Sequence, residues 1–238
     1  MALPSGAGLI SLAVVTTPYG GPVTFLFVPS PLVGAATWAP VADLLGGPVA
    51  DLAGATTPAA VVDAVAAAAA GLEEVVLVPH SNAGLYAPLL AARLGARATV
   101  YVDAALAGDG PDTPLAPPRF LELLQDLACD DGLLPPWTRW WEDVSGLFPD
   151  DATRAAVEAG QPRLPLAYFT SRVEVPPGWL SRPNAYLAFG DTYADEVALA
   201  LAHGWPLTTM PGRHLHQLVA PTEVAGAIAE LAARAGAP

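Results

Sequence analysis

The sequence contains no lysine and has few basic residues of any kind. Its ten basic residues are all arginine, against 23 Asp and Glu, which gives a formal net charge of -13 at pH 7. Nucleic acids and anionic membrane surfaces are bound through basic patches, so this charge balance argues against both as partners. We expect the acidity to serve solubility, and the preference for arginine, alanine, glycine and proline to reflect a GC-rich bacterial genome.

Cysteine and long apolar runs are equally scarce. The single cysteine, Cys129, cannot form a disulfide within the chain, so nothing here requires an oxidising compartment. No apolar run approaches the roughly 18 residues of a membrane span. The first basic residue is Arg93, so the amino terminus lacks the positive start of a secretion signal. We therefore expect a cytoplasmic protein that does not enter a membrane.

The most informative segment is 75–84, where an apolar run meets small and turn-forming residues. It reads Val-Val-Leu-Val-Pro-His-Ser-Asn-Ala-Gly, and the helix-forming stretch 85–94 follows at once. Ser81 would then lie on a sharp turn from strand to helix, which lifts its hydroxyl off the end of a sheet as in a nucleophile elbow. Ala83 is small, as such a turn requires, but Pro79 stands where the usual Gly-x-Ser-x-Gly pattern has its first glycine. A serine that only caps the helix is the alternative.

Strand and helix patterns alternate along most of the chain. Strands are expected at 9–16, 23–28, 49–52, 75–78, 98–102, 185–189 and 206–210, and helices at 58–70, 85–94, 120–127, 194–203 and 222–234. The first two strands suggest a hairpin-like start. The remaining alternation builds an α/β fold, a mostly parallel, doubly wound sheet covered by helices on both faces.

One stretch interrupts this alternation. Residues 108–182 are rich in proline and contain Trp137, Trp140 and Trp141. We interpret the stretch as an inserted helical cap or lid. The 238 residues are otherwise read as a single domain, large enough to bury roughly 70 to 75% of its unfolded surface.

A serine hydroxyl becomes a useful nucleophile when a base takes its proton, so the hypothesis requires a histidine close to Ser81. His80 adjoins the serine, but side chains of neighbouring residues diverge, and we expect it to shape the pocket. His203 stands at an expected helix end, where histidine commonly caps. His214 and His216 follow the last expected strand, in a loop that should lie near the elbow. The alternative is that both are loop histidines exposed to solvent.

At this loop the chain resembles the α/β-hydrolase family. The family's histidine loop usually runs Pro-Gly-x-Gly-His or similar and precedes a terminal helix that starts at proline. Residues 211–214, Pro-Gly-Arg-His, and 221–223, Pro-Thr-Glu, fit that layout. The resemblance covers nearly the whole chain and implies Ser81 as nucleophile, His214 as general base and His216 as a residue of the pocket.

A narrower resemblance concerns the segment 134–141, with its prolines and tryptophans, and the triplet 214–216, His-Leu-His. Both look like a group of uncharacterised actinobacterial members of the family. This likeness brings no known substrate.

Family members place the acid that orients the histidine after either of two strands, and the chain offers one carboxylate at each place. Asp103 ends the strand that follows the elbow helix, and Asp191 follows the strand 185–189. At the second place the family pattern is Gly-x-x-Asp, whereas the tetrapeptide 190–193, Gly-Asp-Thr-Tyr, has tyrosine in the position of the aspartate. We therefore favour Asp103 and keep Asp191 as the alternative. Either could instead be a turn-forming aspartate.

Acyl transfer also requires donors aimed at the developing oxyanion. The first is expected to be the backbone N–H of Asn82, directly after the serine. The second should come from the loop 29–32, Pro-Ser-Pro-Leu, which replaces the family's His-Gly-x segment. There Pro31 occupies the donor position without an N–H to give, so Leu32 N–H or the Ser30 hydroxyl would have to substitute.

The pocket is expected to be mostly apolar. We place Pro31, Trp137, Trp140, Trp141 and His216 in its lining, although buried tryptophans are more often plain core. No spacing of His, Cys and carboxylates resembles a metal site, and the glycines form no phosphate loop, so neither metal nor cofactor is expected.

The leading interpretation is a serine hydrolase of a small, largely apolar ester, thioester or lactone, with a small-molecule substrate as its partner. Because of the prolines at 29 and 31, a second interpretation keeps fold and pocket but assigns a lyase, isomerase or cyclase of secondary metabolism. A third is a noncatalytic ligand-binding or scaffold protein that retains the elbow.

Overall fold

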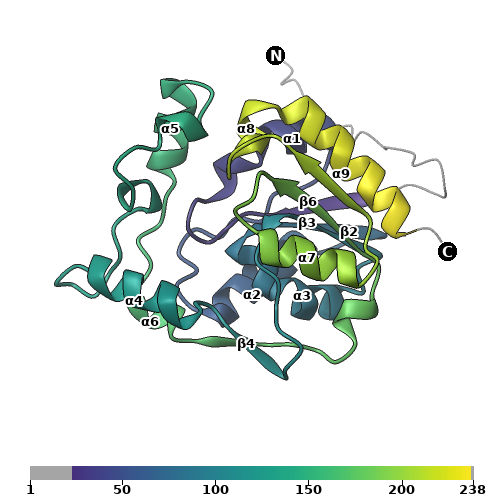
Figure 1. Ribbon diagram of the computed structural model, residues 1–238, viewed down its shortest axis with the longest axis horizontal. Helices are drawn as coiled ribbons and strands as arrows, with labels where there is room; N and C mark the ends of the chain where they lie inside the picture. The colour runs from purple at the N-terminus through teal and green to yellow at the C-terminus, as the bar shows by residue number, and fades with distance from the viewer. Residues whose placement is uncertain (1–22, 237–238) are drawn as a thin grey trace, which may run out of the picture.

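The structure, a computed structural model, describes residues 23–236 and is built around one central sheet (Figure 1). The five strands of this sheet are β1 (Thr24–Val28), β2 (Val75–Ser81), β3 (Ala98–Ala104), β6 (Asn184–Phe189) and β7 (Leu207–Met210), in the order β1-β2-β3-β6-β7. Every neighbouring pair is parallel. The predicted doubly wound parallel sheet is confirmed, and all carboxyl ends of its strands meet at one edge.

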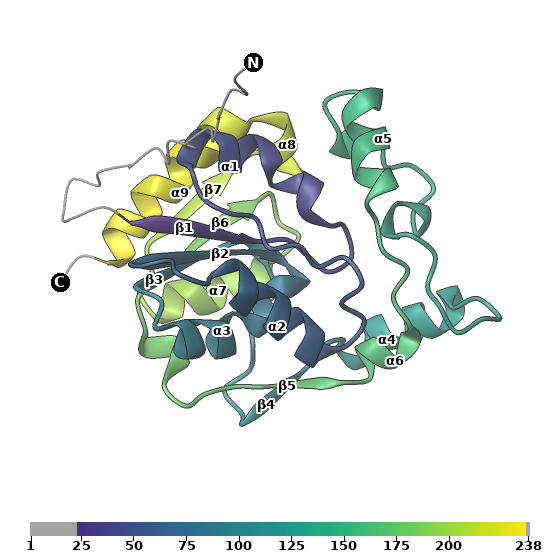
Figure 2. The same ribbon diagram turned by 180° about the vertical axis from the view of Figure 1, so that it is seen from behind.

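Helices cover both faces of the sheet, as the two opposite views show (Figures 1 and 2). One face carries α1 (Ala39–Leu45), α8 (His216–Val219) and α9 (Pro221–Ala235), and the other carries α2 (Pro58–Ala68), α3 (Ala87–Leu94) and α7 (Ala194–Ala202). Two apolar cores result, one on each face. The strands β2, β3 and β6 are buried along their whole length, as expected for central strands of a parallel sheet.

Local signals in the sequence start several helices. Thr57 precedes α2, and its side chain accepts a hydrogen bond from the Ala60 N–H at 3.2 Å, with Pro58 in the first helical position. Both features agree with the preferences of helix starts. Helix α9 likewise begins at Pro221, directly after the histidine loop.

Residues 108–182, the interrupted stretch of the sequence, lie between β3 and β6, and the helical middle of the stretch, residues 118–169, stands beside the carboxyl ends of the strands (Figures 1 and 2). The helices and strands of this segment are β4 (Asp112–Pro114), α4 (Pro118–Leu127), α5 (Asp151–Ala159), α6 (Leu166–Phe169) and β5 (Arg172–Glu174), with short 3-10 helices η3 (Trp137–Arg139), η4 (Ser145–Leu147) and η5 (Trp179–Ser181). Strands β4 and β5 form an antiparallel pair. We call this stretch the 108–182 segment below.

The expected helices and strands differ from the structure at three points, one of which lies outside the described residues. The strand expected at 49–52 is a single bridge between Val49 and Phe27, because only the Ala50 N–H and the Pro48 carbonyl bond to Phe27 before the chain turns away. Helices α1, α5, α6 and α8 are additional to those expected. The strand expected at 9–16, and with it the hairpin-like start, lies outside the described residues.

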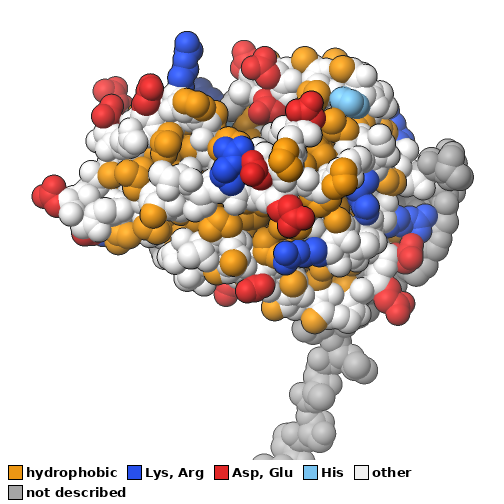
Figure 3. All heavy atoms as spheres, turned by 90° about the horizontal axis from the view of Figure 1, so that it is seen from below, with side chains coloured by type: hydrophobic (Ala, Val, Ile, Leu, Met, Phe, Trp, Pro, Cys, Tyr) orange, Lys and Arg blue, Asp and Glu red, His pale blue; other side chains and the backbone are white. Residues whose placement is uncertain are grey.

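In the described part of the chain, the helices include no long apolar span, and the surface shown in Figure 3 has no strongly basic region. Within residues 23–236, no helix combines the length and the apolar character that crossing a bilayer requires. On the face seen from below, arginine side chains are dispersed among acidic and hydrophobic ones (Figure 3).

Candidate active site

The chain turns sharply at Ser81, where β2 ends and the 3-10 helix η2 (Asn82–Tyr86) begins. Ser81 has φ 59° and ψ -130°, a positive φ that a non-glycine residue rarely adopts. Close packing surrounds the turn: Ala83 is fully buried, and a Cβ on Gly84 would overlap the carbonyl oxygen of Ala105. Small residues at these positions therefore let the turn approach the end of β3.

Two hydrogen bonds connect Ser81, His214 and Asp103, which come from three separate elements. Nε2 of His214 lies 2.9 Å from Oγ of Ser81, and Nδ1 lies 2.6 Å from Oδ2 of Asp103. A carboxylate accepts hydrogen bonds, so Nδ1–H donates to Asp103, and the lone pair at Nε2 faces the serine hydroxyl. The serine O–H can donate to that lone pair, which is the arrangement needed to remove its proton.

The Asp103 carboxyl group is fully buried and held on both oxygens. Its Oδ1 accepts the Phe189 N–H at 2.9 Å while its Oδ2 accepts from His214. Asp103 also has a positive φ, 41°. The next residue, Ala104, is held by the Tyr186 hydroxyl, which donates to its carbonyl at 2.6 Å and accepts its N–H at 3.0 Å. Contacts from β6 thus fix the conformation of the chain at the carboxyl end of β3.

Asp191, the other candidate acid, is exposed to solvent and makes no side-chain hydrogen bond among the described residues. It follows β6 by only two positions, with Gly190 between them at φ 68°. The structure thus brings Asp103, and not Asp191, to His214.

His80 supports the histidine loop from behind and does not itself line the cavity. Its ring is fully buried, stacks on the His214 ring at a centroid distance of 4.6 Å, and donates from Nε2 to the His214 carbonyl at 2.9 Å. Burial, and to a lesser extent His214, holds the pKa of His80 well below its ordinary value. A neutral imidazole therefore packs behind His214.

The loop after β1 lies beside Ser81, as its role as a source of oxyanion donors would require. Leu32 lines the cavity at Ser81, whereas Pro31 does not. The Leu32 N–H donates to Oγ of Ser30 at 3.3 Å, a long bond between buried groups. Asn82 also lies at the cavity, and its side-chain amide donates to the Leu115 carbonyl at 3.0 Å, which ties the elbow to the 108–182 segment.

A cavity of about 720 Å³ opens at Ser81 and His214. Its apolar lining includes Leu32, Leu85, Leu106, Leu115, Pro117, Phe120, Trp137, Trp141, Val144 and Leu147, most of them from the 108–182 segment. Three charged residues, Asp143, Glu196 and Arg213, also line it. Burial, with the nearby carboxylates of Asp195 and Asp103, raises the pKa of Glu196. This volume and mostly apolar lining suit one small organic molecule.

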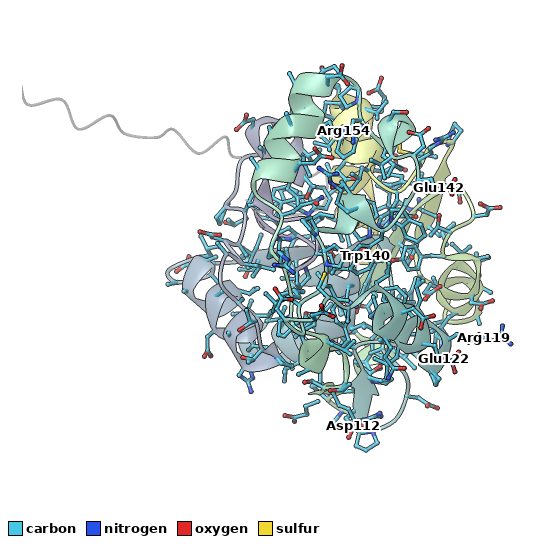
Figure 4. All side chains as sticks on the ribbon, turned by 90° about the vertical axis from the view of Figure 1, so that its left-hand side faces the viewer. Asp112, Arg119, Glu122, Trp140, Glu142 and Arg154 are labelled. Atoms are coloured by element: carbon cyan, nitrogen blue, oxygen red, sulfur yellow. The ribbon has the colours of Figure 1, made fainter. Side chains whose placement is uncertain are left out.

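Of the five residues expected in the pocket, two line it: Trp137, whose ring centroid lies 5.9 Å from that of His214, and Trp141. The other placements were wrong. Trp140 is buried within the 108–182 segment, where its indole N–H donates to the Pro135 carbonyl at 2.8 Å (Figure 4). His216 turns away and packs its ring edge-on against Phe189.

Three residues of the site, Tyr193, Glu196 and Arg213, were not expected from the sequence, and Tyr193 is the most important of them. Its hydroxyl lies 3.5 Å from Oγ of Ser81. In the sequence, Tyr193 is distinguished only by its departure from the family's Gly-x-x-Asp pattern, and that departure is the available signal. No feature of the sequence indicated that Glu196 and Arg213 would line the site. Arg213 packs so closely on Gly146 that a Cβ there would overlap its guanidinium, so the histidine loop contacts the 108–182 segment directly.

Comparison with known proteins gives a consistent result for the fold. No protein-family model and no curated protein matches the sequence. Among solved structures, an extracellular α/β-hydrolase from a Paenibacillus species is 20% identical, with a TM-score of 0.64 over 90% of this chain and 99% of that one. A pyrethroid hydrolase is 19% identical, with a TM-score of 0.64 over 88% and 97%. A mutant of tomato methylketone synthase I is 14% identical, with a TM-score of 0.68 over 90% and 98%.

These likenesses cover nearly the whole of each relative, but their sequence identities are low. They bear on the fold and leave the narrower resemblance to actinobacterial members a prediction. The order of the parallel strands, the turn at Ser81 and the matching solved structures agree: the chain has the α/β-hydrolase fold.

Proposed function

We propose that the protein is a serine hydrolase that cleaves a small, largely apolar ester, thioester or lactone. Ser81 acts as nucleophile, His214 as general base and Asp103 as the acid that orients the histidine. The observation that carries the proposal is the hydrogen-bonded series from Ser81 to His214, 2.9 Å, and on to Asp103, 2.6 Å, at the edge of an apolar cavity.

In the first half-reaction Oγ of Ser81 attacks the substrate carbonyl carbon, and its proton passes to Nε2 of His214. The tetrahedral intermediate then expels the leaving oxygen or sulfur, which receives that proton from His214. A water molecule repeats the sequence on the acyl-enzyme and returns the serine. Asp103 stays ionised throughout and stabilises the imidazolium through Nδ1–H.

The oxyanion of each tetrahedral intermediate requires hydrogen-bond donors. Asn82 N–H stands at the start of η2, where peptide N–H groups have no partner within the helix. Leu32 N–H is the second donor, and it must exchange the 3.3 Å bond to Ser30 for one to the oxyanion. This exchange takes the place of the donor that Pro31 cannot supply.

The walls of the cavity support the substrate class. Leucines, Phe120 and two tryptophans give mostly apolar contact, while the charged groups are few. Because the 108–182 segment supplies most of these residues, we assign it the role of a cap that closes over a small-molecule substrate. The solved relatives include proteins described as a hydrolase and a pyrethroid hydrolase, which accords with this chemistry. A location in the cytoplasm stays a prediction.

The decisive experiment combines labelling and kinetics. A fluorophosphonate should label Ser81, and Ser81→Ala should abolish labelling and lower kcat on a short p-nitrophenyl ester by several orders of magnitude, on the order of 10⁶ by analogy with other serine triads. Ser181→Ala, at an exposed serine of η5, is the matched control and should behave as the parent protein. A loss below about tenfold in Ser81→Ala would refute the nucleophile.

A second candidate function, a lyase, isomerase or cyclase reaction at the same residues, is favoured by the absence of an N–H at Pro31. One of the solved relatives is a synthase by name. Labelling of Ser81 without turnover of any ester would favour this candidate. A folded protein that binds a ligand but shows neither labelling nor turnover would point to a noncatalytic binding protein.

A further inference from the structure

The hydroxyl of Tyr193 contacts the reacting atom of the site from a direction that the proposed mechanism does not use. It lies 3.5 Å from Oγ of Ser81, at the long end of the hydrogen-bond range. Among the described residues, Oγ of Ser81 is its only hydrogen-bond partner. Catalytic hydrogen bonds are often long in free enzymes and shorten in the complex with substrate.

The position of Tyr193 follows from the placement of the acid. The tyrosine precedes α7, after β6, where the family's usual pattern has its aspartate. Here Asp103, from the end of β3, already binds Nδ1 of His214. The phenol ring therefore occupies the space beside the histidine, with its centroid 5.8 Å from that of His214, and its hydroxyl extends to the serine.

The order of the strands decides from which side this hydroxyl approaches. Leu32 follows β1, on one side of β2, whereas Tyr193 follows β6 and His214 follows β7, on the other side. The oxyanion donor Leu32 N–H thus lies at the β1 side of Ser81. Tyr193 lies on the side from which His214 takes and returns the proton, and this is the side of the leaving group.

The hydroxyl is also suited to donate. Burial raises the pKa of Tyr193 above its ordinary value and outweighs the lowering by the hydrogen bond with Ser81, while the carboxylates of Asp103 and Glu196 raise it further. The phenol keeps its proton at neutral pH. The Ser81 oxygen can donate its own proton to His214 and still accept a hydrogen bond from Tyr193 through a lone pair.

We propose that Tyr193 is a catalytic residue that donates a hydrogen bond to Ser81 Oγ before attack and to the oxygen of the departing alcohol as its bond to the acyl carbon breaks. No bond to Tyr193 forms. The proton that reaches the leaving oxygen is the one His214 took from Ser81, and Tyr193 retains its own throughout. This role rests on the proposed hydrolase function, and it implies that the natural substrate is an ester of a poorly leaving alcohol.

The test compares two esters of one acid, ethyl butyrate and p-nitrophenyl butyrate, in the parent protein and in Tyr193→Phe. For both esters kcat/KM reports the steps through acylation. A hydrogen bond to a charge-bearing oxygen matters most where the leaving group is poor. We expect Tyr193→Phe to lower kcat/KM by about 10- to 100-fold for the ethyl ester and by less than about threefold for the p-nitrophenyl ester.

The control is Tyr101→Phe, which removes a hydroxyl from a buried tyrosine of β3 that does not line the cavity, and which should leave both esters unaffected. Equal losses on the two esters in Tyr193→Phe, or no loss on either, would overturn the role. A parent protein that hydrolyses neither ester and takes no label at Ser81 would instead overturn the hydrolase function, and the role of Tyr193 with it.

Discussion

Replacing Asp103 by asparagine removes one of the two carboxylate oxygens that accept hydrogen bonds in the structure. Oδ1 accepts the Phe189 N–H at 2.9 Å, and Oδ2 accepts His214 Nδ1–H at 2.6 Å. Asparagine offers one acceptor oxygen and one NH₂ donor in nearly the same shape. The variant therefore cannot satisfy both neighbours with the histidine in its present tautomer.

The structure decides which orientation the amide takes. If its NH₂ faced the Phe189 N–H, two buried donors would oppose each other without an acceptor, at a cost of about 1 to 3 kcal/mol. With the carbonyl oxygen toward Phe189, the NH₂ faces Nδ1 of His214 and donates to it. The ring proton then moves to Nε2, where it blocks removal of the Ser81 proton.

We expect Asp103→Asn to lower kcat by up to about 10⁴, which corresponds to roughly 5 kcal/mol of transition-state stabilisation. The assay is steady-state hydrolysis of a short p-nitrophenyl ester, with thermal unfolding to check that the variant folds. Asp191→Asn is the matched control because Asp191 is exposed. A loss below about tenfold in Asp103→Asn, or a larger loss in Asp191→Asn, would refute the assignment of the acid.

Two further predictions concern residues behind the site. Tyr186→Phe leaves the buried N–H and C=O of Ala104 without their partner, the Tyr186 hydroxyl. Urea unfolding should therefore show a free energy of unfolding that is lower by about 2 to 4 kcal/mol. A change below about 0.5 kcal/mol would contradict a stabilising role for these two hydrogen bonds. Burial depresses the pKa of His80 in the native state, so below about pH 6.5 the unfolded chain binds a proton that the native protein does not. The free energy of unfolding therefore decreases as the pH is lowered, by up to about 1.4 kcal/mol per pH unit. In His80→Gln the decrease between about pH 7 and pH 5 should be shallower, whereas His203→Gln, at an exposed position, should keep the slope of the parent protein.

The sequence predicts the fold well because its central strands are short apolar runs separated by helix patterns. The strands expected at 75–78, 98–102 and 185–189 are all present, each extended by one to three residues. Carboxyl ends of parallel strands meet at one edge, so a serine after one strand and a histidine after another were predictable neighbours. The strand pattern thus brings Ser81 close to the loop 211–216, and the resemblance of that loop to the α/β-hydrolase family selects His214 rather than His216.

The lining of the pocket could not be predicted in the same way, because it depends on where individual side chains point. Trp137 and Trp141 line the cavity, but Trp140 between them is rotated into the 108–182 segment. Helix α5 was missed for a different reason. Its amino-terminal cap is present, since Asp150 accepts the Thr153 N–H at 2.7 Å, but the surrounding prolines and glycines obscure this signal.

The sequence favours Asp103 as the acid because tyrosine replaces the aspartate in residues 190–193, but it does not reveal the backbone conformations that hold this acid in place. Ser81 and Asp103, at the ends of neighbouring strands, both have positive φ, a strained state for non-glycine residues that persists only where surrounding contacts fix it. The bond from Ala105 N–H to the Ser81 carbonyl, 3.1 Å, joins the two turns, and Tyr186 holds the second. In this chain the acid thus comes from the end of β3, next to a turn that Tyr186 of β6 holds, and the end of β6 carries Tyr193. The departure from the family pattern in the sequence thus has a structural counterpart, since Asp103 supplies the carboxylate at His214 and the residue in the usual position of the aspartate places a phenol beside the same ring.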